Sequence, residues 1–317
     1  MKAITFDKFG GAEELKYRDI ANPVVKDDEV LINIKYTSVN PVDWKIREGL
    51  FKDRMTHNFP VIPGWDAAGK IAEKGKNVNN FNVGDEVYAY TRKEAVSEGT
   101  YSEYIAVPSN FVALKPKNID FAQAAAIPLV GLTAWQSLFD IGKLQKGQTI
   151  LIQAGAGGVG SFAIQLAKYI GATVITTTST ANVEYCKKLG ADRVIDYKKE
   201  NFSEVVKKAY PQGIDFVYEM VGGQVMADSA QLIKKGGVIV SIYLPLDKAE
   251  AKRLGIRSEY CFVRPSGEQL AEITKLIDSG KIQIPQIEKM SFKDAARAQE
   301  KNKQGHTRGK IVLEINP

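Results

Sequence analysis

Cysteine and histidine are scarce in this chain, whose 317 residues include two of each. Two cysteines, Cys186 and Cys261, are too few for a disulfide framework or a four-cysteine zinc site, and they indicate a reducing, cytoplasmic compartment. His57 and His306 are expected to be surface or loop residues rather than metal ligands. No run of about 18 apolar residues is present, so we expect no membrane-spanning helix. The first residues lack the apolar core of a signal peptide, so we expect no secretion.

Nucleic-acid-binding motifs are also missing, although the formal net charge is +6 and the isoelectric point about 9.0. The lysines are scattered along the chain, as on an ordinary solvated surface. Without a recognisable motif, the positive charge alone does not favour nucleic acid as a partner. The length is sufficient for two domains, each with its own core.

A glycine-rich turn is the most informative feature that is present. The apolar run Ile150–Ile152 predicts a strand buried on both faces, and a helix is expected over 158–169. Between them the chain reads G-x-G-x-x-G, the pattern of a dinucleotide-binding turn. In such turns the first glycine allows the bend, the second lets the backbone approach the pyrophosphate, and the third lets helix and strand pack closely. The expected pyrophosphate-binding residues are Gly155, Ala156, Gly157, Gly158, Val159 and Gly160.

No acidic residue occurs between Ala156 and Val183. A fold specific for NAD usually has Asp or Glu about 20 residues after the first glycine, where it binds the ribose hydroxyls. Here the second strand ends in threonine and serine, over Thr176–Thr180, which leaves room for a 2′-phosphate. The pattern therefore favours NADPH over NADH, although a run of threonines also suits an ordinary strand end.

Two domains are predicted from the order of the elements. Residues 1–124 show short strands separated by turns, whereas strands and helices alternate from residue 149 to about 241, as in a doubly wound parallel sheet. The fold class expected is α/β, with residues 125–265 forming a Rossmann domain. A β-rich domain of residues 1–124 is completed by the C-terminal residues 266–317.

The chain resembles the medium-chain dehydrogenase/reductase superfamily, and within it the zinc-independent quinone oxidoreductase and enone (2-alkenal) reductase branch. The resemblance covers nearly the full length and implies a GroES-like N-terminal domain. It rests on segments that follow one another in the family's order: Ser38–Gly49, Pro63–Gly69, Gly84–Val87, Gly99–Tyr104, Gly131–Ala134, Ala154–Gly160, Leu189–Asp192 and Gly309–Leu313.

Zinc-dependent members of the superfamily place a cysteine where this chain has Asn40 and a histidine where it has Trp65. Their third ligand falls near Leu129, and their cysteine-rich zinc lobe has no counterpart here. An amide, an indole and an aliphatic side chain do not make a tetrahedral zinc site, so we expect no zinc. Without a Lewis acid, the resemblance implies hydride transfer from NADPH to acceptors already activated by conjugation, namely quinones or α,β-unsaturated carbonyls.

The resemblance also assigns individual residues. Asn40 and Thr133 are expected beside the nicotinamide, and Ser179 and Tyr197 at the adenosine phosphate. The alternatives are that Asn40 only caps a turn before Pro41 and that Thr133 only fills a helix interior. Many relatives have a lysine where this chain has Asn182, which leaves Ser179, Thr180 and Tyr197 to hold the phosphate. Val221, Ile242 and Tyr243 follow strands at the carboxyl edge, where ligands bind in such sheets. Arg308 and Lys310 are candidates for reaching the cofactor phosphates, with a solvated surface as the alternative.

The substrate pocket is expected to be apolar. Its candidate residues, each of which also suits the core, are Phe51, Trp65, Tyr88, Tyr243 and Phe262. Asp43 and Lys45 are candidate proton donors, with water as the alternative. Relatives join their Rossmann sheets edge to edge, and Tyr260–Arg264 has the alternation of an outer strand, so we expect a homodimer. Two other functions stay open: a non-catalytic NADPH-binding protein with an RNA-binding role, and a zinc alcohol dehydrogenase.

Overall fold

The computed structural model describes residues 1–305 and 308–315, and the chain divides into two compact units. The first consists of Met1–Leu129, Arg264–Ser279 and Ile284–Pro317, and the second of Val130–Val263 and Gly280–Gln283. Within the described ranges, no helix combines the length and the apolar character needed to cross a bilayer.

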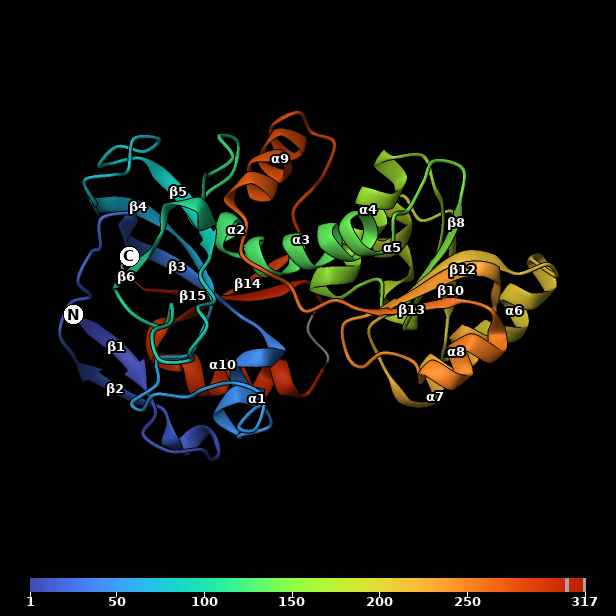
Figure 1. Ribbon diagram of the computed structural model, residues 1–317, viewed down its shortest axis with the longest axis horizontal. Helices are drawn as coiled ribbons and strands as arrows, with labels where there is room; N and C mark the ends of the chain where they lie inside the picture. The colour runs from blue at the N-terminus through green and yellow to red at the C-terminus, as the bar shows by residue number, and fades with distance from the viewer. Residues whose placement is uncertain (306–307, 316–317) are drawn as a thin grey trace. The chain divides into compact units, whose positions relative to one another are not determined.

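The first unit is built on a seven-stranded sheet with the order β14-β15-β3-β4-β5-β7, in which β6 also pairs with β3 (Figure 1). The C-terminal strand β15 runs antiparallel to β3 and pairs Ile311 with Val39. The C-terminus thus completes the sheet of the N-terminal part, as predicted. The strands are β3 (Glu29–Val39), β4 (Asp66–Lys74), β5 (Glu86–Tyr90), β6 (Tyr104–Pro108), β7 (Val112–Leu114), β14 (Ile287–Ser291) and β15 (Lys310–Glu314), with β1 (Lys2–Thr5) and β2 (Lys16–Asp19) in a separate pair.

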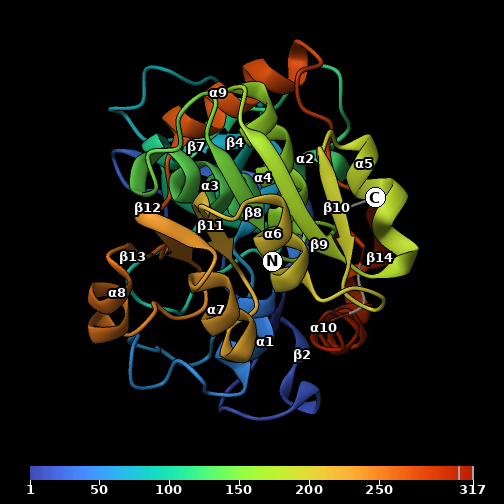
Figure 2. The ribbon, with the colours of Figure 1, turned by 90° about the vertical axis from the view of Figure 1, so that its right-hand side faces the viewer.

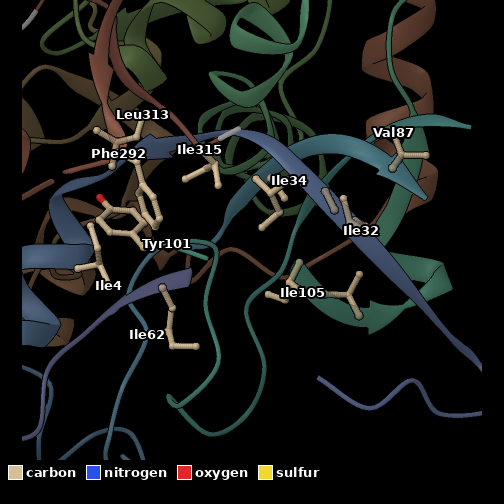
Figure 3. Packing of buried hydrophobic residues seen from close by; sticks show 14 of the residues in the cluster. Ile4, Ile32, Ile34, Ile62, Val87, Tyr101, Ile105, Phe292, Leu313 and Ile315 are labelled. Carbon is tan, nitrogen blue, oxygen red and sulfur yellow. The ribbon is translucent and has the colours of Figure 1, made fainter. Parts of the chain in front are cut away.

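The core of this unit lies against β3, whose alternate side chains Val30, Ile32 and Ile34 are fully buried. Figure 3 shows side chains from β1, β3, β5, β6 and β15 converging in this cluster. Each large apolar side chain buried in this way contributes about 1.5–3 kcal/mol to stability. The helices of the unit are α1 (Pro41–Arg47), α2 (Phe121–Ala125), α9 (Gly267–Asp278) and α10 (Ala295–Lys303), and α3 (Pro128–Trp135) continues into the second unit.

The second unit contains a six-stranded sheet with the order β10-β9-β8-β11-β12-β13, in which all neighbours are parallel (Figure 2). Numbered along the chain, this is the order 3-2-1-4-5-6 of a dinucleotide-binding sheet. The predicted Rossmann fold is therefore confirmed. The strands are β8 (Thr149–Ile152), β9 (Thr173–Thr178), β10 (Arg193–Asp196), β11 (Ile214–Glu219), β12 (Ile233–Ser241) and β13 (Arg257–Tyr260); the helices are α4 (Gly158–Tyr169), α5 (Val183–Lys188), α6 (Phe202–Ala209), α7 (Gly223–Ala230) and α8 (Lys248–Leu254).

The outer strand of this sheet differs from the prediction. We expected it at Tyr260–Arg264, but β13 spans Arg257–Tyr260, and the apolar residues that suggested a strand follow it. An edge strand has one paired side and one open side, so it does not need the apolar run of a central strand. Helix α1, helix α8 and strand β14 were not predicted.

Candidate functional site

The glycine turn joins β8 to α4 in the second unit. The turn covers residues 153–156, and its positive φ, 53°, is at Ala154 rather than at a glycine of the motif. A non-glycine residue in this region costs about 1–2 kcal/mol, and such strain often marks a functional turn. Gly155 is needed for a different reason: a Cβ there would lie 2.1 Å from Oγ1 of Thr176.

The other two glycines of the motif differ in what surrounds them. A Cβ on Gly160 would lie 2.4 Å from the carbonyl oxygen of Ala154 and 2.8 Å from Cα of Gly155, so the backbone itself excludes a side chain. A Cβ on Gly157 would meet only the oxygen of Ala154, at 3.4 Å. The fold therefore tolerates a side chain at Gly157 better than at Gly160, and the free space at Gly157 suits close approach by a ligand.

Helix α4 begins at this turn, with Gly157 as its N-cap. The N–H group of Ser161 donates to the oxygen of Gly157, which is the first hydrogen bond of the helix. The N–H groups of residues 158–160 precede this bond at the positive end of the helix dipole. Such groups favour a bound phosphate.

The threonines that end β9 mostly serve the turn. The hydroxyl of Thr176 donates to the oxygen of Ile152, at 2.7 Å, and that of Thr177 donates to Oε1 of Gln153, at 2.5 Å. The N–H group of Ala154 also donates to Thr177. Because both side chains are buried and used in this way, their hydroxyls are not available to a 2′-phosphate.

Ser179, Thr180, Asn182 and Tyr197 lie at the ends of the neighbouring strands β9 and β10. The amide of Asn182 donates to Oγ of Ser179, and the hydroxyl of Thr180 donates to Asp196 at 2.6 Å. This hydrogen bond, above all, lowers the pKa of Asp196. Tyr197 is half exposed.

Two lysines that we did not predict for the site, Lys198 and Lys199, follow the end of β10. The ammonium of Lys198 lies 5.5 Å from the ring centroid of Tyr197, and that of Lys199 lies 3.8 Å from Asp196. They are distant from the threonine run in sequence, but the parallel pairing of β9 with β10 brings the two strand ends together. Parallel pairing was itself predicted, so the sequence carried the signal that Lys198 and Lys199 lie near the threonine run.

Glu219 joins the loops that follow β11 and β12. Its buried carboxylate accepts hydrogen bonds from the N–H groups of Val221, at 2.7 Å, and Gly222, at 2.8 Å. The hydroxyl of Ser241 donates to Oε2 of Glu219, at 3.5 Å, and accepts from the N–H group of Tyr243. The predicted residues Val221, Ile242 and Tyr243 therefore lie on segments that one carboxylate orders. Thr133 is buried, and its carbonyl accepts from the hydroxyl of Tyr218.

In the first unit, a buried polar cluster surrounds Asn40, which is the N-cap of α1. The amide nitrogen of Asn40 donates to Asp66 at 2.8 Å, and its oxygen accepts from the ammonium of Lys310. Asp66 also accepts from the hydroxyl of Ser38, at 2.5 Å, and from the N–H of Leu129, at 2.7 Å. Asn40, Asp66 and Lys310 are all buried.

Lys310 was a candidate for reaching the cofactor phosphates, with a solvated surface as the alternative. Instead it is buried, and it donates to the carbonyl of Val39 as well as to Asn40, 3.6 Å from Asp66. Burial lowers the pKa of Lys310, while Asp66 and Asp43 oppose this shift. The pairing of Ile311 with Val39 explains the location, because it sets Lys310 beside Asn40. Arg308 is exposed.

Asp43 lies in the first turn of α1 and is fully buried. Its Oδ2 accepts from the N–H of Asn40, at 2.8 Å, and from the hydroxyl of Tyr101, at 3.1 Å. Its Oδ1 has no hydrogen-bond partner among the described residues. Burial raises the pKa of Asp43 to about 7, against the lowering effect of its hydrogen bonds. Lys45 is half buried, and burial lowers its pKa.

The candidate pocket residues do not share one environment. Tyr88 belongs to the core, since its ring is fully buried and its hydroxyl donates to the carbonyl of Leu270 at 2.7 Å. Trp65 is buried with its ring edge-on to Tyr90. Phe51 is half buried, and Tyr243 and Phe262 are exposed.

The positions that hold zinc in metal-dependent relatives carry no ligand set. Asn40 is engaged by Asp66 and Lys310, and Leu129 contributes a backbone N–H to Asp66. No cluster of three or more His, Cys, Asp or Glu side chains suited to a metal occurs among residues 1–305 and 308–315. His57 is half buried against the ring of Phe9, and His306 lies outside the described residues.

Known proteins match this chain over its whole length. Residues 26–117 match the family described as alcohol dehydrogenase GroES-like domain, and residues 189–313 match the family described as zinc-binding dehydrogenase. The 2-methylene-furan-3-one reductase of Solanum lycopersicum is 38% identical over 100% of this chain and 80% of its own length. The chloroplastic NADPH-dependent alkenal/one oxidoreductase of Arabidopsis thaliana is 38% identical over 99% of this chain and 79% of its own.

A solved structure has the same fold over the same length. The quinone oxidoreductase from Coxiella burnetii superimposes with a TM-score of 0.88 and 35% sequence identity, over 100% of this chain and 99% of that one. The likeness includes both units.

Proposed function

Since the chain belongs to the medium-chain dehydrogenase/reductase superfamily, together with quinone oxidoreductases and alkenal/one oxidoreductases, we propose that it is an NADPH-dependent reductase of quinones or α,β-unsaturated carbonyls. The observation that carries the proposal is the glycine turn, with its open space at Gly157 and its helix N-terminus. This turn fits the diphosphate of a dinucleotide. Nothing in the fold or in these relatives favours the RNA-binding alternative.

When bound, NADPH would supply the hydride. The N–H groups at the start of α4 would hold its diphosphate, and Ser179, Thr180 and Tyr197 would meet the adenosine end. Lys198 and Lys199 add positive charge there, which favours a 2′-phosphate over a hydroxyl and takes the place of the lysine missing at Asn182. Asn40 would donate an N–H to a carbonyl oxygen beside the nicotinamide.

Zinc independence is part of the proposal. The polar cluster supports it, because the ammonium of Lys310 lies against the oxygen of Asn40, where a second cation would be repelled. An acceptor that is already conjugated needs no Lewis acid, so the proposed hydride transfer does not require a metal. A cytoplasmic location is also proposed, because the two cysteines are buried and are not joined in a disulfide.

The direct test is NADPH and NADH oxidation with four acceptors: a benzoquinone, a phenanthrenequinone, a short 2-alkenal and a cyclic enone. We expect turnover with NADPH on at least one quinone or enone, slower turnover with NADH, and no effect of a chelator. A saturated aldehyde serves as the control acceptor and should not react. Turnover of a saturated aldehyde that stops on chelation would instead identify a zinc dehydrogenase.

A homodimer is proposed from the edge strand β13, which is the last strand of its sheet. Tyr260 at the end of this strand and Phe262 after it are 38% and 45% exposed, and their stacked rings have centroids 6.4 Å apart. An open edge with exposed aromatic rings favours pairing with a second copy. Light scattering should give twice the 34.9 kDa of the chain, and Phe262→Lys should shift the mass towards the monomer. Leu50→Lys, at another exposed apolar residue, should not; a monomeric wild type would contradict the proposal.

A further inference from the structure

The amide of Asn40 lies between a carboxylate and an ammonium. Its nitrogen donates to Asp66 at 2.8 Å, and its oxygen accepts from Lys310 on β15. Turning the amide by half a revolution would place its oxygen against Asp66 and its nitrogen against Lys310. Both contacts would then be repulsive, since a carboxylate only accepts and an ammonium only donates. One orientation is therefore strongly favoured.

The two charged groups are themselves well held. Asp66 accepts from Ser38 and Leu129, and Lys310 donates to the carbonyl of Val39. All of these partners lie within the first unit, and the exposed fractions of the Asp66 and Lys310 side chains are 0% and 4%. A buried charge pair is weak evidence for stability, because apolar residues of similar size are often at least as stable. Stability alone therefore does not explain why Asp66 and Lys310 are buried together.

We propose that Asp66 and Lys310 are positioning residues that orient the amide of Asn40 as a hydrogen-bond donor. With one N–H given to Asp66, the amide nitrogen retains a second N–H, whereas the amide oxygen faces Lys310. This orientation suits a carbonyl oxygen rather than a donor group as the partner of Asn40, whose side chain is 0% exposed and must be uncovered when a ligand binds. Carbonyl oxygens occur in the carboxamide of the nicotinamide and in both classes of acceptor, so the inference rests on the proposed function and specifies how Asn40 serves it.

The test is a double-mutant cycle between Lys310→Met and Asn40→Ala, with kcat/KM for the best acceptor and the dissociation constant of NADPH as readouts. Lys310→Met alone should lower kcat/KM about tenfold, which is the scale of one hydrogen bond to a charged group. In the Asn40→Ala background the same substitution should change kcat/KM less than about twofold, because the residue it orients is gone. If neither kcat/KM nor the dissociation constant of NADPH shows this coupling, the positioning role is wrong.

Lys115→Met is the matched control. Lys115 is also a buried lysine of the first unit, and it donates to the carbonyls of Pro116 and Ile119, away from Asn40. Its substitution should leave kcat/KM and NADPH affinity within about twofold of the wild type in both backgrounds. Asp66→Asn tests the carboxylate that accepts from the amide of Asn40, and it should show the same coupling to Asn40. The inference therefore stays testable if Lys310→Met does not fold.

The outcomes separate the inference from the proposed function. An active wild type whose Lys310 and Asp66 effects are the same with and without Asn40 overturns the positioning role and leaves the function intact. A wild type that neither binds NADPH nor reduces any acceptor overturns the proposed function, and the inference with it.

Discussion

Gly160→Val is expected to lower NADPH affinity at least about a hundredfold and to lower the free energy of unfolding by about 1–3 kcal/mol. The first carbon of the new side chain would lie 2.4 Å from the oxygen of Ala154 and 2.8 Å from Cα of Gly155. Both are backbone atoms, so no side-chain rotation relieves the contact. The turn must move, and the N–H groups that would face the diphosphate move with it.

Gly157→Ala is the informative companion, because its Cβ would meet only one protein atom, at 3.4 Å. We expect this variant to unfold like the wild type and yet to bind NADPH more weakly, since the ligand rather than the protein needs the space. Fluorescence titration with NADPH and thermal unfolding measure the two effects separately. A Gly160→Val protein that binds NADPH as tightly as the wild type would show that the turn is not the cofactor site.

The fold was predictable because its main signals are local. Buried strands such as Ile150–Ile152 and the long helix α4 show their periodicity within one segment. Helix α1 was missed because seven residues carry little periodicity, although an N-cap asparagine followed by proline is a recognised start signal. The positive φ of Ala154 could not be predicted, because alanine has no preference for that region and the packing of the turn imposes it.

The candidate site was predictable only in part, because some of its contacts join segments that are far apart in the sequence. The glycine motif lies in one segment, so its residues could be predicted together as a candidate cofactor site. The partners of Asn40 lie on β4 and at the start of β15, and only the register of β15 against β3 brings Lys310 to Asn40. Glu219 likewise acts across two strand ends. Contacts of this kind depend on strand register, which no local pattern specifies.

Asp43→Asn is expected to gain stability relative to the wild type as pH rises, by about 2–3 kcal/mol between pH 5 and pH 8. Burial raises the pKa of Asp43 from 3.8 to about 7. A raised pKa means that the folded protein binds this proton more tightly than the unfolded chain. The stability from Asp43 is therefore fully present below about pH 4 and is lost as pH rises through about 7. Asparagine does not titrate, so the variant lacks this loss.

The direction of the effect follows from the charges around Asp43. Protonated Asp43 leaves Lys310 to balance Asp66 alone, whereas ionised Asp43 adds a second buried negative charge beside one ammonium. Asparagine keeps an acceptor for the N–H of Asn40 and the hydroxyl of Tyr101, so the start of α1 is retained. Urea unfolding of both proteins at pH 5 and pH 8 measures the difference, and Asp53→Asn, at an exposed carboxylate, is the control. An equal stability gap at the two pH values would mean that Asp43 is already ionised at pH 5, with Lys310 as its counter-ion.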